Sequence, residues 1–198
     1  MPVTDPNDII TKKTKFSVSA DPGGQYAERY AMMMLHAGKY DKKVVCMNPY
    51  HHKVQYYETD MMGITHHANY IRWMEEARID FMEQIGFPYA AMEAQGIVSP
   101  VKSVSCNYQH TSTFNDEIVI TVSVASFNGV VLVIRYDMQN VKTGEQVCSA
   151  SSEHVFLDRE GHFVRMKRVM PEFYSCLTQL CEASDADGGN NHVRKVLC

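Results

Sequence analysis

The sequence predicts an α+β domain in which one antiparallel sheet curves around one long helix. Residues 70–85 are predicted to form that helix, because apolar side chains recur there at intervals of three and four, on one face. This face carries the only tryptophan, Trp73, so the helix is expected to form the core. After Gly96 the pattern changes to the alternation of half-buried strands separated by tight turns. This order of elements is typical of α+β folds.

The first half of the domain is predicted to contain one strand and two helices. The strand covers residues 51–57, which become rich in β-branched and aromatic side chains toward their end. Asn69 is predicted to cap the start of the long helix, and Gly86 to end it. Pro88 then opens a short helix over residues 89–93.

The second half is predicted to be mostly strands. Turn signals occur at Asn128-Gly129, Thr143-Gly144 and Glu160-Gly161. A last helix is predicted over residues 171–183. The predicted strands cover residues 97–108, 118–124, 130–136 and 145–157.

Three regions are predicted along the chain. Residues 47–183 form the domain, which at this size can bury its own core. Residues 1–46 carry loop signals and no chemical motif, and we interpret them as an N-terminal extension of unknown function. Residues 184–198 are polar and rich in Gly and Asn, and a flexible tail is expected there.

Composition excludes several classes of function. The net charge of −4 gives no indication of binding to nucleic acid or to an anionic membrane. No run approaches the roughly 20 apolar residues of a membrane-spanning helix. The six cysteines form no Cys-x-x-Cys pair and no zinc-binding pattern, so a reducing compartment, the cytoplasm, is predicted.

The chemistry of the chain is concentrated in residues 58–73, which are predicted to form a strand end, a loop and a helix start. This stretch brings the carboxylate of Asp60 close to the N-terminus of a helix. The first N–H groups of a helix have no intrahelical acceptor and carry partial positive charge. A base or nucleophile beside such an oxyanion site is suited to acyl transfer.

A long ordered motif, YYETDMMGITHHANY, occupies residues 56–70. It resembles the signature of hotdog-fold acyl-CoA thioesterases of the hydroxybenzoyl-CoA thioesterase type, with their Tol-Pal-associated relatives. The resemblance extends over residues 48–180. It implies a hotdog fold and hydrolysis of an acyl-CoA to the free acid and CoA, without metal or organic cofactor. It also implies a homo-oligomer, built from side-by-side dimers that often pair into tetramers, with active sites between two protomers.

The resemblance assigns roles to three residues of the loop and helix start. Asp60 falls on the catalytic aspartate, as general base or nucleophile, and the backbone N–H of His67 falls on the oxyanion donor. Gly63 is expected to let the loop turn or come close to the substrate. The alternative for Asp60 is a loop aspartate that only accepts backbone N–H groups in a turn.

Further substrate contacts are predicted beside the motif and after the last strand. His66 and Tyr70 are expected to line the substrate site. Arg165, Lys167 and Arg168 form the best local basic cluster and are predicted to meet CoA phosphates at a protomer boundary. The alternative for each of these cations is an ordinary charged surface.

Two other functions remain open on the same fold. A hydratase or dehydratase of acyl thioesters would need a histidine together with an Asp or Glu, placed to shuttle protons at carbon, and His66, His67 and His110 are the candidate histidines. A non-catalytic acyl-CoA sensor would use the cleft only for binding. The motif does not select the acyl group, nor CoA over acyl carrier protein.

Two rival sites compete with Asp60. Glu75 and Glu76 lie on the long helix beside its apolar face, where pairing with neighbouring arginines is expected. A zinc site formed by His66-His67 and His51-His52 is not favoured, because adjacent residues of a strand point to opposite sides.

Overall fold

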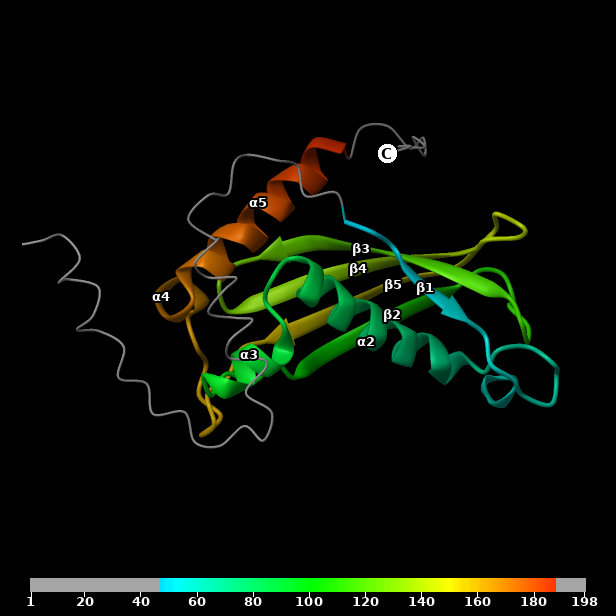
Figure 1. The fold of residues 1–198 in the computed structure, drawn as a ribbon, viewed down its shortest axis with the longest axis horizontal. Coiled ribbons are helices and arrows are strands. Elements are labelled where there is room, and N and C mark those ends of the chain that lie inside the picture. Colours follow the sequence, from blue (N-terminus) through cyan, green and yellow to red (C-terminus); the bar gives the residue numbers. More distant parts are fainter. Residues whose placement is uncertain (1–46, 188–198) are drawn as a thin grey trace, which may run out of the picture. The chain divides into compact units, whose positions relative to one another are not determined.

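The computed structural model describes residues 47–187, so the predicted extension over residues 1–46 and most of the predicted tail lie outside it. Five antiparallel strands form one sheet in the order β1-β3-β4-β5-β2 (Figure 1). Their bounds are Tyr50–Lys53 for β1, Val101–Tyr108 for β2, Glu117–Phe127 for β3, Val131–Asn140 for β4 and Gln146–Val155 for β5.

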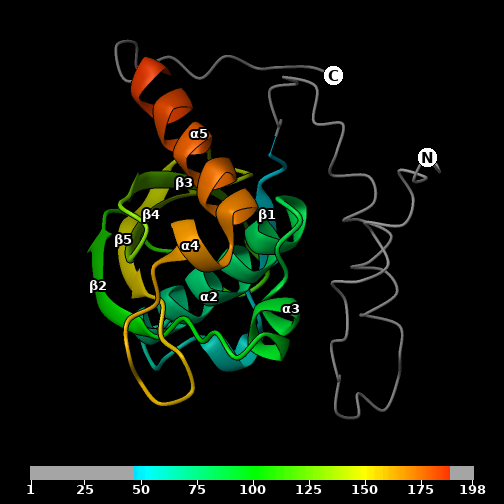
Figure 2. The ribbon, with the colours of Figure 1, turned by 90° about the vertical axis from the view of Figure 1, so that its left-hand side faces the viewer.

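The sheet curves around helix α2, His67–Gln84, which Figure 2 shows almost end-on. This confirms the predicted α+β architecture. An antiparallel sheet wrapped around one long helix is the arrangement called the hotdog fold. No helix in the described part of the chain is long and apolar enough to cross a membrane. The remaining helical elements are the 3-10 turn η3 over Tyr56–Glu58, α3 over Tyr89–Ala94, α4 over Met166–Val169 and α5 over Pro171–Asp187.

The predicted first strand is too long. It ends at Lys53, and the chain turns at η3, so Tyr56 and Tyr57 lie in a 3-10 turn rather than a strand. The cause is Glu58, whose buried carboxylate accepts a hydrogen bond of 2.7 Å from the N–H of Gln55 and thereby closes the turn. The β-propensity of the two tyrosines is overridden by this tertiary burial.

The predicted cap of the long helix is also wrong. The N-cap is His66, and Asn69 lies inside the helix, where its buried side chain donates to the carbonyl of Glu58 at 2.7 Å. Gly86 has φ +86°, the left-handed conformation expected after a helix end. Helix α5 runs four residues beyond the predicted end at 183, to Asp187, and the short α4 is not among the predicted elements.

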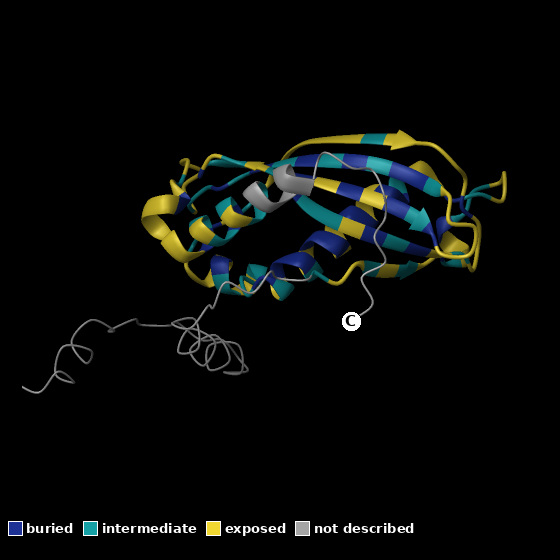
Figure 3. Ribbon diagram, turned by 90° about the horizontal axis from the view of Figure 1, so that it is seen from above, coloured by how far each residue is buried: buried dark blue, intermediate teal, exposed yellow. Residues whose placement is uncertain are grey.

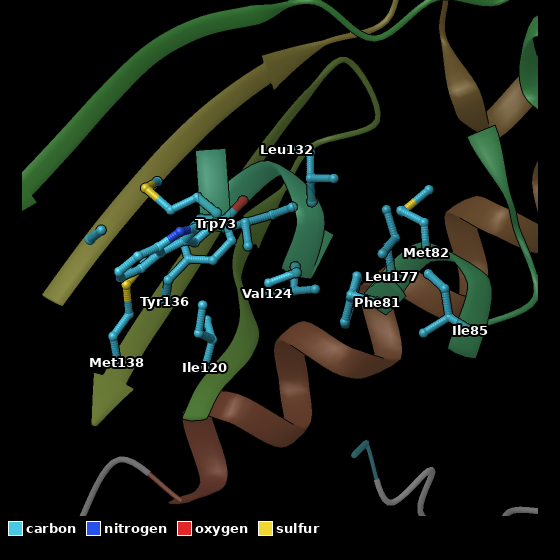
Figure 4. Packing of buried hydrophobic residues seen from close by; sticks show 14 of the residues in the cluster. Trp73, Phe81, Met82, Ile85, Ile120, Val124, Leu132, Tyr136, Met138 and Leu177 are labelled. Atoms are coloured by element: carbon cyan, nitrogen blue, oxygen red, sulfur yellow. The ribbon is translucent and has the colours of Figure 1, made fainter. Parts of the chain in front are cut away.

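The core lies between α2, the inner face of the sheet and α5 (Figure 4). Trp73 is fully buried, as predicted, among side chains of β3 and β4. This packing fixes the helix axis, and with it the direction in which the helix N-terminus points. The labelled core residues are Trp73, Phe81, Met82, Ile85, Ile120, Val124, Leu132, Tyr136, Met138 and Leu177.

The edge strand β2 is far more exposed than the central strands of the sheet. Along β4 buried residues alternate with less buried ones, whereas β2 is exposed along almost its whole length and appears mostly yellow in Figure 3. Strand β2 begins at Val101 rather than at residue 97, and only Val98 makes an isolated bridge before it, to Leu157. Pro100, at the break, has no N–H to donate to a ladder.

His154, near the end of β5, is a buried titratable group. Its Nε2 lies 2.6 Å from the hydroxyl oxygen of Ser152, which in turn lies 2.9 Å from the hydroxyl of Tyr136. Its Nδ1 has no hydrogen-bond partner among the described residues. Burial, and then the positive charge of Arg78, lower the pKa of His154 from 6.5 to about 4.

His154 is expected to make the fold sensitive to acid. The imidazole of His154 takes up a proton less readily in the folded protein than in the unfolded chain. The contribution of neutral His154 to the free energy of unfolding is therefore complete above pH 6.5. It is lost as the pH falls toward 4, and over that interval it amounts to about 3 kcal/mol. Urea unfolding of the wild type and His154→Gln should show a stability difference that shrinks in acid. His51→Gln, which alters a half-exposed ring, is the control. Parallel pH profiles of wild type and His154→Gln would contradict the argument.

Candidate active site

Residues 59–65 form a tight loop between η3 and α2. Thr59 and Thr65 make an isolated antiparallel bridge, and the N–H of Asp60 donates to the carbonyl of Ile64 at 2.9 Å. Gly63 has φ +74°, and a Cβ built on it would meet no atom within 4 Å. The glycine therefore serves the backbone conformation of the turn, not close packing within this chain.

The two carboxylate oxygens of Asp60 have different surroundings. Oδ1 accepts a hydrogen bond from the N–H of Met62 at 2.8 Å, the contact expected of a turn aspartate. Oδ2 has no hydrogen-bond partner within residues 47–187, and Asp60 lines a cavity. The structural contact of one oxygen thus orients the carboxylate and leaves the other for a water or a substrate.

The start of α2 offers one unused donor beside this carboxylate. The N–H of Ala68 donates to Nδ1 of His66 at 3.3 Å, and that of Asn69 to the carbonyl of His66 at 3.0 Å. The N–H of His67, the first residue of this 18-residue helix, has no acceptor among the described residues. Such an N–H at the positive end of a helix dipole can stabilise a developing oxyanion.

These groups meet in a cavity of about 290 Å³. Tyr108, at the end of β2, closes one side and donates from its hydroxyl to the carbonyl of His67 at 3.1 Å. At the loop, Met61 is fully exposed and Met62 is 74% exposed. The lining residues are Asp60, Met62, Ile64, Thr65, His67, Tyr70, Tyr108, Gln109, His110 and Thr111.

Three hydroxyls support the wall behind the cavity. The Oγ atom of buried Ser112 lies 2.8 Å from Oγ1 of Thr65 and 3.0 Å from the hydroxyl oxygen of Tyr70. Burial raises the pKa of Tyr70, and burial together with Cys106 raises the pKa of Tyr108 to about 12. Both phenols therefore remain neutral at physiological pH and add no negative charge near Asp60.

The structure brings some of the predicted site residues together and not others. Asp60, His67 and Tyr70 line one cavity. Gly63 and His66 shape the loop and cap the helix without lining it. The basic cluster Arg165–Arg168 lies on and beside α4, at the opposite end of α2 in the same chain (Figure 1), and none of its side chains lines the cavity.

Sequence reasoning missed Tyr108 and Gln109 as cavity residues. Tyr108 is the last residue of β2 and Gln109 follows it, about 40 positions from the motif, and the register of β2 on β5 places this strand end at the cavity. No local pattern in the sequence marks this contact. Ser112, which holds Thr65 and Tyr70, lies in the loop before β3 and gave no signal either.

The histidines do not converge on one point. His51 pairs with Glu117 at 2.8 Å, and His52 lies between Glu58 and Glu76 at 2.9 and 3.3 Å. His66 and His67 pack ring to ring, 4.2 Å apart. Within residues 47–187, the side chains near enough to one another to share a metal ion are Asp158, Glu160 and His162, on an exposed turn.

The rival carboxylates of α2 have partners elsewhere. Glu75 forms a long ion pair of 3.9 Å with Arg78, three residues further along the helix, as predicted. Glu76 accepts from the hydroxyl of Tyr50 at 3.0 Å, and neither glutamate lines the cavity. In the described part of the chain, none of His66, His67 and His110 forms an ion pair with a carboxylate. His67 and His110 share the cavity with Asp60, and among the described residues no hydrogen bond or ion pair joins either ring to that carboxylate.

Comparison with known proteins identifies a family and a fold for this chain. The sequence model of the thioesterase-like superfamily matches residues 54–183. The chain is 32% identical over 124 residues to a putative acyl-CoA thioesterase, YneP, of Bacillus subtilis (strain 168), across 62% of this chain and 89% of that protein. It is 26% identical over 90 residues to the acyl-CoA thioester hydrolase YbgC of Escherichia coli O6:H1, across 46% and 67% of the two chains. A DHNA-CoA thioesterase from Staphylococcus aureus superposes with a TM-score of 0.67 at 29% identity, covering 72% of this chain and 95% of that one.

The loop conformation at Gly63 can be tested by substitution. Gly63→Ala places a side chain in the left-handed region and should lower the free energy of unfolding by about 1 to 2 kcal/mol. Gly63→Asn should cost less, because asparagine tolerates this region better. Urea unfolding measures both. Because a Cβ at this position would have no atom within 4 Å, equal losses for Ala and Asn would mean that φ is not the cause.

Proposed function

The chain belongs to the thioesterase-like superfamily, and we infer from this membership that it is an enzyme that hydrolyses acyl-CoA thioesters to the free acid and CoA. One observation carries the assignment of the site. Asp60, which has a free carboxylate oxygen, and His67, which has an unused backbone N–H, line the same cavity. A thioester carbonyl between them would meet a base or nucleophile on one side and an oxyanion donor on the other.

In the general-base route, Asp60 removes a proton from a water whose oxygen attacks the carbonyl carbon. The carbonyl oxygen becomes an oxyanion that accepts from the His67 N–H. The carbon–sulfur bond then breaks, and the proton held by Asp60 passes to the departing CoA sulfur. Loss of one oxyanion donor typically costs on the order of a hundred- to a thousandfold in rate.

In the nucleophilic route, the carboxylate of Asp60 itself attacks the carbonyl carbon and expels CoA thiolate, which takes up a proton. The resulting mixed anhydride is then hydrolysed by water to the free acid and Asp60. Both routes place the same oxyanion against His67. A single turnover in ¹⁸O-labelled water that leaves label in Asp60 would identify the nucleophilic route, with water opening the mixed anhydride at the Asp60 carbonyl. Attack at the acyl carbonyl instead puts the label in the product acid, as the general-base route does.

Other residues of the site are proposed to bind the substrate. Tyr70 would contact the acyl group from the cavity wall, while Gly63 and His66 keep the loop and helix start open to it. Arg165, Lys167 and Arg168 would meet the CoA phosphates of a substrate held between two copies of the chain. This role is supported by the concentration of three exposed cations at α4, away from the cavity of their own chain.

We further propose a homodimer joined along β2, with two dimers forming a tetramer. Strand β2 is an edge strand whose Val101 and Val104 are 51% and 38% exposed, an unusual state for a β-branched apolar strand. Tyr108 ends this strand and closes the cavity, so a copy paired along β2 would border both active sites.

The reaction as proposed uses water and protein groups alone, without metal or organic cofactor. A cytoplasmic location is proposed from the state of the cysteines. Among the described residues, Cys106, Cys148 and Cys176 are free thiols, as expected in a reducing compartment.

Asp60→Asn tests the catalytic assignment. Asparagine keeps a carbonyl oxygen for the N–H of Met62, so the loop turn should persist while the base is lost. We expect kcat to fall by about a hundred- to ten-thousandfold with little change in KM. Free thiol released from a panel of acyl-CoAs, detected with a thiol-reactive dye, measures this.

The matched control is Asp116→Asn. This carboxylate also accepts a backbone N–H, that of Thr113 at 2.8 Å, but lies outside the cavity, so kcat should hold. A fully active Asp60→Asn protein would refute the mechanism. Water addition to an enoyl-CoA without thiol release would select a hydratase, and tight binding without turnover would select a sensor.

Val104→Lys tests the proposed dimer. A charge placed on an edge strand opposes pairing with a second edge, so the variant should elute as a monomer. Light scattering coupled to size-exclusion chromatography gives the mass. Val141→Lys, at a 50% exposed position in the turn after β4, is the control and should leave the mass unchanged. A dimer of unchanged stability in Val104→Lys would place the interface elsewhere.

A further inference from the structure

Glu58 is a buried carboxylate that the catalytic chemistry does not use. It is 5% exposed and does not line the cavity. Oε1 accepts from Nε1 of Trp73 at 2.8 Å, and Oε2 accepts from the N–H of Gln55 at 2.7 Å and lies 2.9 Å from Nε2 of His52. A carboxylate that meets donors from β1, η3 and α2 is an anchor between these three elements.

The backbone of Glu58 holds the other end of the catalytic loop. Its carbonyl accepts from the N–H of His66 at 2.8 Å and from Nδ2 of Asn69 at 2.7 Å. Glu58, which precedes the loop that carries Asp60, is therefore hydrogen-bonded directly to His66, which follows the loop. One residue thus sets the spacing between the carboxylate and the helix start.

The side chain makes that spacing rigid. Trp73 lies in the centre of the core with no exposed surface, and the ring of His52 packs against it with centroids 4.5 Å apart. His52 also reaches Glu76 at 3.3 Å, which ties the same group to the outer face of α2. Burial alone would raise the pKa of Glu58, but the hydrogen bonds from Gln55, His52 and Trp73 outweigh it and keep the pKa below its ordinary value. The group is therefore a carboxylate at neutral pH.

We propose that Glu58 is a positioning residue for the thioesterase reaction, which holds Asp60 and the His67 N–H at their working separation through its bonds to Trp73, Gln55 and His66. This rests on the proposed function. The carboxylate joins the rigid core to the loop, and reacting groups displaced by about 1 Å can lose on the order of a hundredfold in rate.

Glu58→Gln is the first test. Glutamine has the same size but a single acceptor oxygen, so it cannot serve both Trp73 and Gln55. We expect kcat to fall by about ten- to a hundredfold while KM stays nearly constant, because the loss falls on the transition state. Hydrogen exchange of a peptide spanning residues 59–67 should become faster, while one spanning β4 keeps its wild-type rate.

Three variants separate positioning from general destabilisation. Leu177→Ala weakens the core on α5, away from the loop, and should lower the melting temperature without changing kcat at 25 °C. Glu75→Gln alters another carboxylate of α2, which pairs with Arg78 and belongs to neither the Glu58 network nor the cavity, and should leave kcat and loop exchange unchanged. Trp73→Phe removes the donor to Oε1, and its effect on kcat should be far from additive with that of Glu58→Gln.

The outcomes are distinguishable from failure of the proposed function. Faster loop exchange together with reduced kcat in folded Glu58→Gln supports the proposal. Wild-type exchange of residues 59–67, or wild-type kcat despite faster exchange, overturns it. If the wild type releases no thiol from any acyl-CoA, the proposed function fails, while the exchange measurement still decides whether Glu58 holds the loop.

Discussion

The burial of helix α2 inside the curved sheet is the constraint on which the site depends. Trp73 and the apolar side chains that follow it fill the core, so the helix cannot rotate or slide without opening that core. Its N-terminus is thereby fixed in space. The backbone N–H of His67 needs no help from its own side chain, because the packing of the helix already fixes the direction of this N–H.

A short loop completes the geometry at little conformational cost. Only residues 59–65 separate the two ends that meet at the carbonyl of Glu58, and they are closed by the Thr59–Thr65 bridge. Such a loop has few alternative conformations, so Asp60 enters the cavity already oriented by the N–H of Met62. Another part of the cavity wall comes from Tyr108, at the end of an edge strand, whose hydroxyl donates to the carbonyl of His67.

Local patterns predicted the architecture well, and long-range contacts explain what they missed. The helix and the turns follow from periodicity and from glycines such as Gly86, which need no knowledge of the rest of the chain. The cap was misplaced because Asn69 and His66 are both able to accept an N–H, and only the contact of Asn69 with Glu58 decides between them. Tyr108 reaches the site through sheet register, and the position of the cluster Arg165–Arg168 depends on the path of the chain after β5. Neither can be read from neighbouring residues.

The exposure of the loop that carries Asp60 has a consequence of its own. Met61 and Met62 present their thioethers to solvent beside Asp60, whereas Met74, Met82, Met92, Met138 and Met166 are enclosed in the core. Peroxide would therefore reach the loop methionines long before those of the core, and a sulfoxide there would put a polar, chiral group at the cavity. Oxidative inactivation of this protein would then precede any loss of its fold, and methionine sulfoxide reductases could reverse it.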